Sequence, residues 1–97
     1  MALSTTAWDP AAHIVTIDDA VAYLEAAFED GDPAMITTIL GALARSEGMT
    51  RIAREAGVSR EGLYKALSEN GDPRLSTFMG VLKALGLQLA VTTRPAA

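Results

Sequence analysis

The sequence predicts an all-α domain of five principal helices that ends in a short β-strand. Apolar residues recur at three- and four-residue intervals over most of the chain, and glycine or proline separates the resulting segments. A strand is predicted over residues 87–92 because apolar and polar residues alternate there. We expect a leader over residues 1–15, a single domain over residues 16–92 and a tail over residues 93–97.

The first helices are predicted from their caps. Asp9-Pro10 favours a single helical turn that reaches His13 within the leader. Thr16 and Asp19 have the spacing of a capping box, which predicts a long helix that ends near residues 30–31. The residues expected to be buried on it are Ile17, Ala20, Val21, Leu24 and Phe28.

Similar signals bound the second and the last long helices. Asp32-Pro33 places a cap before a proline at the first helical position, and Gly48 ends that helix. A turn over residues 70–73 (Asn-Gly-Asp-Pro) precedes a final helix over residues 75–85, which Gly86 terminates. The apolar residues that should face the core are Ile36, Ile39, Leu40 and Leu43 on the second helix, and Leu75, Phe78, Met79, Leu82 and Leu85 on the last.

Residues 49–68 have the pattern of a helix-turn-helix motif. Thr50 is expected to cap a short helix, and Gly57 to end it in the left-handed conformation that glycine adopts without strain. Ser59 is then placed to cap a second helix over residues 60–68. Ala53 and Leu63 have the sizes needed where two helices cross steeply, so the pattern predicts one tightly packed helical pair.

The outward face of the second helix carries residue types that read DNA. Arginine can grip guanine with two hydrogen bonds, glutamate can accept from cytosine, and serine or tyrosine can add groove or phosphate contacts. The predicted base or groove contacts are Ser59, Arg60, Glu61, Tyr64, Lys65 and Ser68, and the predicted phosphate contacts are Thr50, Arg51 and Arg74. The alternatives are a solvated face on an ordinary helical pair and a module that binds protein.

The net charge of −4 is unusual for a DNA-binding protein, but the charges are divided along the chain. Residues 1–44 hold seven acids and no Lys or Arg, whereas residues 45–97 hold all eight bases and five acids. A basic half can face phosphate while an acidic half attracts a basic protein, so the division predicts two different partners. The alternative for the acidic half, including Glu25 and Glu29, is merely solvated surface.

The predicted strand would leave its backbone groups unpaired within one chain. Pairing with the same strand of a second copy, or with the sheet of another protein, would satisfy them. We expect a symmetric homodimer, whose two reading helices would fit a palindromic operator. The alternative is an extended tail packed on the last helix.

Composition argues against a membrane protein, a secreted protein and an enzyme. The chain has no cysteine, no apolar run long enough to span a membrane and no secretory signal, so we expect a cytoplasmic protein without disulfides. Its single histidine, His13, has no second ligand or catalytic group beside it in the sequence. We therefore expect no enzyme activity, no metal site and no cofactor.

The segment Ala22 to Leu89 resembles the addiction-module antidote proteins, the HigA-like antitoxins of bacterial toxin–antitoxin pairs. The similarity is densest over residues 48–73, which read GMTRIAREAGVSREGLYKALSENGDP. The resemblance implies a lambda-repressor-like domain that represses its own operon and neutralises a RelE-like ribonuclease toxin, a small basic protein. Gly62 stands where such proteins commonly carry a polar residue, and Asp72-Pro73 replaces a commoner Asn-Pro. A free-standing transcriptional regulator without a toxin would share every DNA-binding residue.

Overall fold

The computed structural model describes residues 16–95, and within this range the chain is all-helical. The predicted all-α class is confirmed for these residues. The leader and its helical turn from Asp9-Pro10 to His13 lie outside the described residues. The five helices within residues 16–95 are α2 (Ile17–Asp30), α3 (Pro33–Glu47), α4 (Met49–Ala56), α5 (Arg60–Ala66) and α6 (Leu75–Ala84).

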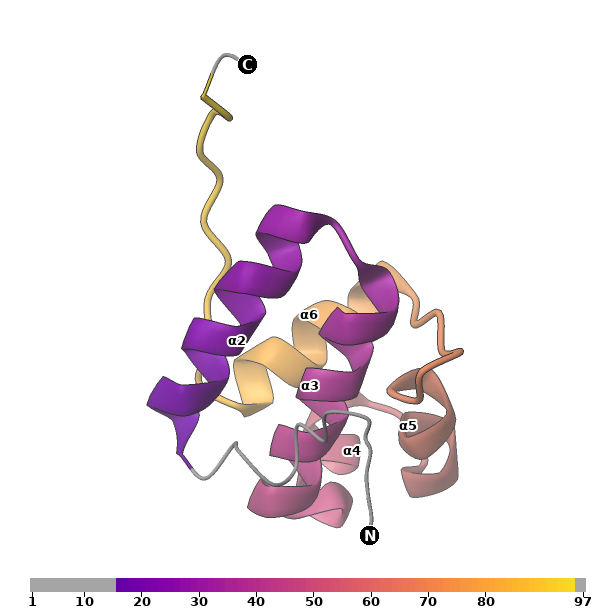
Figure 1. Ribbon diagram of the computed structural model, residues 1–97. Helices are drawn as coiled ribbons and strands as arrows, with labels where there is room; N and C mark the ends of the chain where they lie inside the picture. The colour runs from indigo at the N-terminus through magenta and orange to yellow at the C-terminus, as the bar shows by residue number, and fades with distance from the viewer. Residues whose placement is uncertain (1–15, 96–97) are drawn as a thin grey trace, which may run out of the picture.

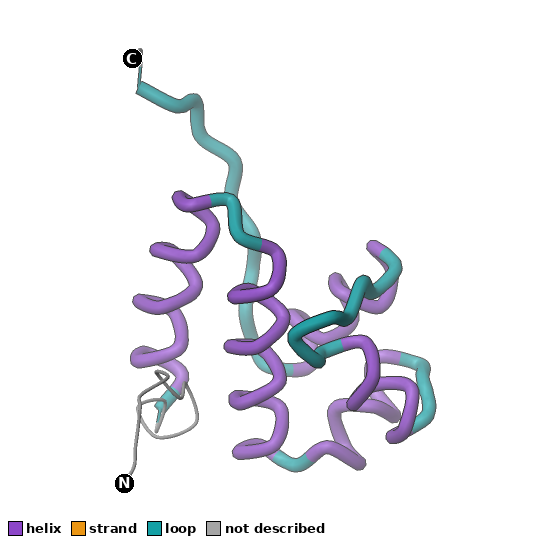
Figure 2. The backbone as a smooth tube through the Cα atoms, turned by 45° about the vertical axis from the view of Figure 1, so that its right-hand side comes forward, coloured by secondary structure: helices purple, strands orange, loops and turns teal. Residues whose placement is uncertain are grey.

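Helices α2 and α3 form a hairpin that stands side by side in both backbone views (Figure 1, Figure 2). The capping box of α2 is confirmed, because the Thr16 hydroxyl accepts from the Asp19 N–H while the Asp19 carboxylate accepts from the Thr16 N–H, each at 3.1 Å. The Asp32 carboxylate accepts from the first N–H groups of α3, directly before Pro33. Local signals therefore set both helix starts.

The core lies where α3 and α4 meet the other helices. Helix α3 packs against α2 and α4, and α4 also packs against α5 and α6. The C-terminal half of α3 is buried on nearly every side, from Ile39 to Ala44. The largest fully buried side chains are Ile39, Leu40, Leu43, Ile52, Leu63 and Val81.

The buried face of α6 is rotated from the predicted one. Leu75 and Met79, expected in the core, are 73% and 47% exposed, whereas Val81, which we did not select, is fully buried. The reason is that α6 lies against α4 so closely that a Cβ on Gly80 would come within 3.0 Å of the Ala56 Cα. Periodicity marks an apolar stripe, but the contact with α4 decides which edge of it is covered.

The prediction also buries both ends of the apolar face of α2, whereas the structure leaves them partly exposed. Ile17 and Phe28 are each more than one-third exposed, although Ala20 and Leu24 are buried as predicted. Phe28 makes an edge-to-face contact with Phe78, with ring centroids 6.4 Å apart. The middle of α2 thus holds the helix on the core while its ends reach the surface.

The predicted C-terminal strand is wrong for this structure, since residues 87–95 form no strand. They leave α6 as an extended segment that runs beside α2 (Figure 1). A strand requires a neighbour that accepts and donates its backbone hydrogen bonds, and residues 16–95 place no other extended segment alongside. Side-chain alternation therefore predicted an extended backbone but not its pairing.

None of the helices between residues 16 and 95 is both long enough and apolar enough to cross a bilayer.

Candidate nucleic-acid interface

A tight turn joins α4 to α5. Gly57 ends α4 with φ +76°, and its N–H donates to the Ala53 and Arg54 carbonyls. The Val58 N–H also donates to the Ala53 carbonyl, at 3.0 Å, and the Val58 side chain packs against the core. These bonds satisfy carbonyl groups that the end of α4 would otherwise leave free. The predicted position and cause of the turn are confirmed.

The caps of the two helices differ from each other. The Ser59 hydroxyl accepts from the Gly62 N–H at 2.9 Å, which confirms Ser59 as the cap of α5. Thr50 is not a cap, because α4 begins at Met49 and no side chain caps it. Since Gly48 ends α3 and immediately precedes α4, no residue with a capping side chain occupies the position before Met49. Thr50 instead lies in the first turn of α4, exposed to solvent.

Helix α5 ends at Ala66, two residues before the predicted end. Ser68 lies beyond the helix, where its hydroxyl donates to the Lys65 carbonyl at 2.8 Å. Leu67 is buried and is the C-cap residue. The chain leaves the helix here because Leu67 enters the core against α3, where a Cβ on Gly41 would come within 2.7 Å of the Leu67 carbonyl oxygen.

A buried hydroxyl ties the end of α5 to α3. The Thr37 hydroxyl lies 2.9 Å from the Ser68 carbonyl oxygen and 3.1 Å from that of Ala34 within its own helix. Together with the complete burial of Leu63, this contact fixes α5 at both its middle and its end. No sequence pattern indicated this role for Thr37, because a threonine inside a helix usually bonds only its own backbone.

The opposite face of α5 is open to solvent. Arg60 lies over the Tyr64 ring, with the guanidinium carbon 5.7 Å from the ring centroid, so the two side chains orient each other. All six residues selected as base or groove contacts are exposed to solvent, five of them from the cap to the last turn of α5 and Ser68 just after it: Ser59, Arg60, Glu61, Tyr64, Lys65 and Ser68.

Arg51 makes three contacts within the chain. Its guanidinium lies 3.0 Å from the Glu55 carboxylate and 3.7 Å from that of Glu47. It also donates to the Ala84 carbonyl at 3.3 Å, at the C-terminal end of α6. Arg51 therefore joins α4 to α6, and its charge already faces two carboxylates. The four-residue spacing of Glu47, Arg51 and Glu55 is a sequence signal for the two ion pairs, whereas no spacing could reveal the contact with Ala84, which lies 33 residues away.

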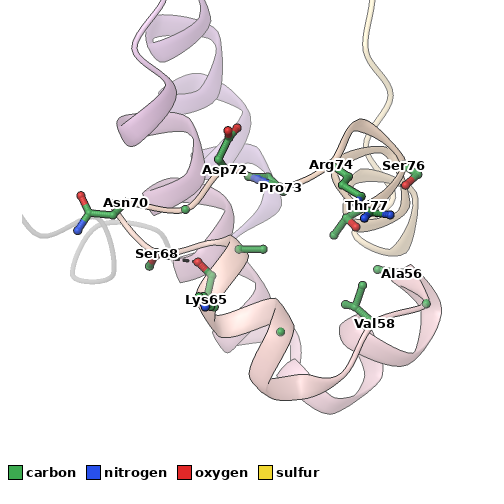
Figure 3. A pocket seen from close by; sticks show the side chains of 14 residues that line it. Ala56, Val58, Lys65, Ser68, Asn70, Asp72, Pro73, Arg74, Ser76 and Thr77 are labelled. Atoms are coloured by element: carbon green, nitrogen blue, oxygen red, sulfur yellow. Dashed lines mark hydrogen bonds between the residues drawn. The ribbon is translucent and has the colours of Figure 1, made fainter.

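A concave surface lies between α5 and the start of α6 (Figure 3). Lys65 and Arg74 lie on opposite sides of it, and Ser76 and Thr77 add hydroxyl groups from the first turn of α6. No side chain caps α6, so the N–H groups of its first turn have no side-chain partner. Sequence reasoning selected Arg74 but missed Ser76 and Thr77, although the turn at residues 70–73 signalled the start of this helix.

Charge is distributed unevenly around this site. Within the described residues, every Lys and Arg lies at position 45 or beyond, and α2 carries only acidic charges. Among residues 16–95, no group of three acidic or histidine side chains is arranged to hold a metal ion. What the α4–α5 face offers is hydrogen-bond donors, acceptors and cations on a rigid helix.

These features define a small all-helical protein that presents one polar helix from a fixed helical pair. Residues 4–93 match the family described as "Probable addiction module antidote protein". An uncharacterized protein of Haemophilus influenzae is 44% identical over 84 residues, which cover 87% of this chain and 87% of that protein. No solved structure matches the chain significantly. The chain belongs to the family of probable addiction module antidote proteins, and such an antidote has a toxin as its partner.

Proposed function

We propose that this protein is the antitoxin of a type II toxin–antitoxin module, of the HigA-like kind, and that α4 and α5 form a helix-turn-helix with which it represses its own operon. The observation that carries this proposal is the polar, solvent-exposed face of α5 on a helix held by Leu63, Leu67 and Thr37. A reading helix must be rigid, because each hydrogen bond to a base edge depends on sub-ångström placement.

In the proposed complex α5 lies in the major groove. Arg60 donates two hydrogen bonds to a guanine, and Glu61 accepts from a cytosine. The contact between Arg60 and Tyr64 pre-orients the guanidinium, which lowers the entropy lost when it binds a base. Ser59, Tyr64, Lys65 and Ser68 add groove or phosphate contacts from the same face.

Phosphate binding is assigned to groups that flank α5. Arg74, with the uncapped start of α6 behind it, faces one strand of the backbone, and Thr50 at the start of α4 contacts another phosphate. Arg51 is a weaker candidate than its sequence position indicated, because Glu47 and Glu55 already compete for its charge. We therefore assign Arg51 mainly to holding α4 against α6.

We propose that two copies bind a palindromic operator as a homodimer. One α5 of seven residues spans only a few base pairs, so a single protomer reads too short a site for useful specificity. Half-sites separated by about one helical turn, roughly 34 Å, place both reading helices on the same side of the duplex.

Membership of the antidote family favours an antitoxin over a free-standing regulator. We propose a small, basic, RelE-like ribonuclease as the toxin, in keeping with the acidic charge of α2. A protein-binding module without DNA affinity is the second candidate, and the net charge of −4 is the observation that favours it.

The test is binding of the purified protein to the promoter upstream of its own gene. Fluorescence anisotropy with that duplex and with a base-shuffled duplex of equal length separates specific from non-specific binding. A preference for the promoter of at least about a hundredfold supports the reading helix. Equal affinity for the two duplexes would refute sequence-specific reading by α5, and no affinity for either would leave only the protein-binding candidate.

A further inference from the structure

A second concave surface lies on another side of the molecule, between α2 and the extended segment 87–95. We call it the acidic groove, defined by Glu25, Phe28 and Glu29 of α2 together with Leu89, Val91 and Arg94 of the segment. Three of its apolar side chains reach solvent: Phe28 and Leu89 are each more than one-third exposed and Val91 is 97% exposed. An apolar surface of this kind with a charged rim is typical of a site where another protein binds.

The backbone along one side of the groove is also unpaired. The last backbone hydrogen bond of the described chain runs from the Leu87 N–H to the Leu82 carbonyl, at 2.8 Å. Residues 88–95 make none with any other described residue. An extended segment with free N–H and C=O groups can hydrogen-bond to an incoming polypeptide.

Charge indicates what kind of polypeptide fits. Glu25 and Glu29 lie one turn apart, and residues 16–44 contain no Lys or Arg to neutralise them. Arg94 is the single cation that lines the groove within the described chain. The exposed acids therefore give this side of the molecule a negative potential over about a Debye length, roughly 8 Å in physiological salt.

We propose that the acidic groove is the toxin-binding surface, and that it receives a toxin segment that combines lysine or arginine with apolar side chains. The inference rests on the toxin partner in the proposed function. In the complex, the cations of the toxin lie against Glu25 and Glu29 while its apolar side chains cover Phe28 and Val91. Its backbone meets the free edge of residues 88–95.

The same charges argue against two other occupants. A two-fold dimer formed through this groove would set the acids of one α2 against those of the other, which is unfavourable. Nucleic acid is repelled for the same reason. In Figures 1 and 2, α2 lies on one side of the molecule and α5 on the other, so the toxin and the operator have separate surfaces.

The experiment measures, by calorimetry, binding of the purified full chain to the product of the reading frame adjacent to its gene. The groove variants are Glu25→Lys, Glu29→Lys and Val91→Asp. The controls make identical changes at exposed positions elsewhere, Glu69→Lys on the loop after α5 and Leu75→Asp on α6. Because the changed side chains are exposed, thermal unfolding should stay near that of the wild type for all five variants, and promoter binding should stay near it for the three groove variants, which lie away from α5.

We expect each groove variant to weaken toxin binding about tenfold or more, and the two controls to change it less than about twofold. Affinity of the wild type should also fall as salt is raised. Equal weakening by Glu69→Lys would mean that net charge acts rather than the groove, and unchanged binding in all groove variants would exclude this surface. A loss of dimer in the groove variants, seen by analytical ultracentrifugation, would reassign the groove to self-association.

The experiment distinguishes failure of the groove proposal from failure of the proposed function. If the wild-type chain binds its promoter but not the neighbouring gene product, the toxin partner fails and this inference fails with it. If the wild type binds both and the groove variants still bind the toxin normally, only this inference is wrong.

Discussion

The salt dependence of operator binding tests the assignment of charges on the α5 side of the molecule. Each Lys or Arg that neutralises a phosphate releases condensed counterions, so affinity falls as salt rises. Of the cations assigned to phosphate, Lys65 and Arg74 are exposed and have no ion pair among the described residues, whereas Arg51 already faces Glu47 and Glu55. Because Arg60 is assigned to a base, the proposed interface has two available phosphate-binding cations for each protomer rather than three.

For a dimer, two cations per protomer neutralise about four phosphates, which corresponds to a slope of about −4 for log affinity against log salt. Raising salt from about 50 mM to about 200 mM should then weaken binding about a hundredfold. If Arg51 left its two carboxylates and also bound phosphate in each protomer, the slope would steepen to about −5. Whether Arg51 binds phosphate or stays paired with Glu47 and Glu55 therefore changes the slope by an amount that a salt titration resolves.

Fluorescence anisotropy of the promoter duplex over a series of salt concentrations gives this slope. Arg74→Ala should make it shallower by about 1 for each protomer, and Arg51→Ala should leave it nearly unchanged. A wild-type slope shallower than about −2 would refute the proposed DNA interface. A change on Arg51→Ala as large as that on Arg74→Ala would refute the argument that intramolecular ion pairs withdraw Arg51.

Four further predictions concern α5, the proposed reading helix, and the contacts that hold it. Arg60→Ala should cost about 1–3 kcal/mol on the promoter but little on the shuffled duplex, and an equal loss on both would exclude base contact. Ser59→Ala should lower the free energy of unfolding in urea by about 1 kcal/mol through loss of the α5 cap, whereas Ser76→Ala, which removes no cap, should not. Thr37→Val should lower that free energy by about 1 kcal/mol because the Ser68 carbonyl loses its partner. Thr38→Val, which breaks only a bond within α3, is its matched control, and a similar effect from both would contradict the tie between α3 and α5. Gly57→Ala should cost about 1–2 kcal/mol, since no atom lies within 4 Å of the new Cβ and the positive φ alone is penalised; a neutral result would show that the turn relaxes.

The sequence by itself determined most of the helix boundaries, with the start of α4 and the end of α5 as exceptions. The caps at Thr16, Asp32 and Ser59, and the terminations at Gly57 and Gly86, lie where the residue types predicted them. Each of these signals acts between residues a few positions apart, so no knowledge of the fold is needed to interpret them. The same holds for the exposed face of α5, because Leu63 and Leu67 mark the side that must turn inward.

Tertiary structure decided which of several local possibilities was realised. Whether Leu75 or Val81 is buried depends on the side from which α4 approaches α6, and Arg51 is engaged because the end of α6 comes to lie beside it. The extended segment 87–95 failed to become a strand for the same reason. A hydrogen-bonded ladder is a property of two segments, and the alternation within one segment specifies only which side chains share a face.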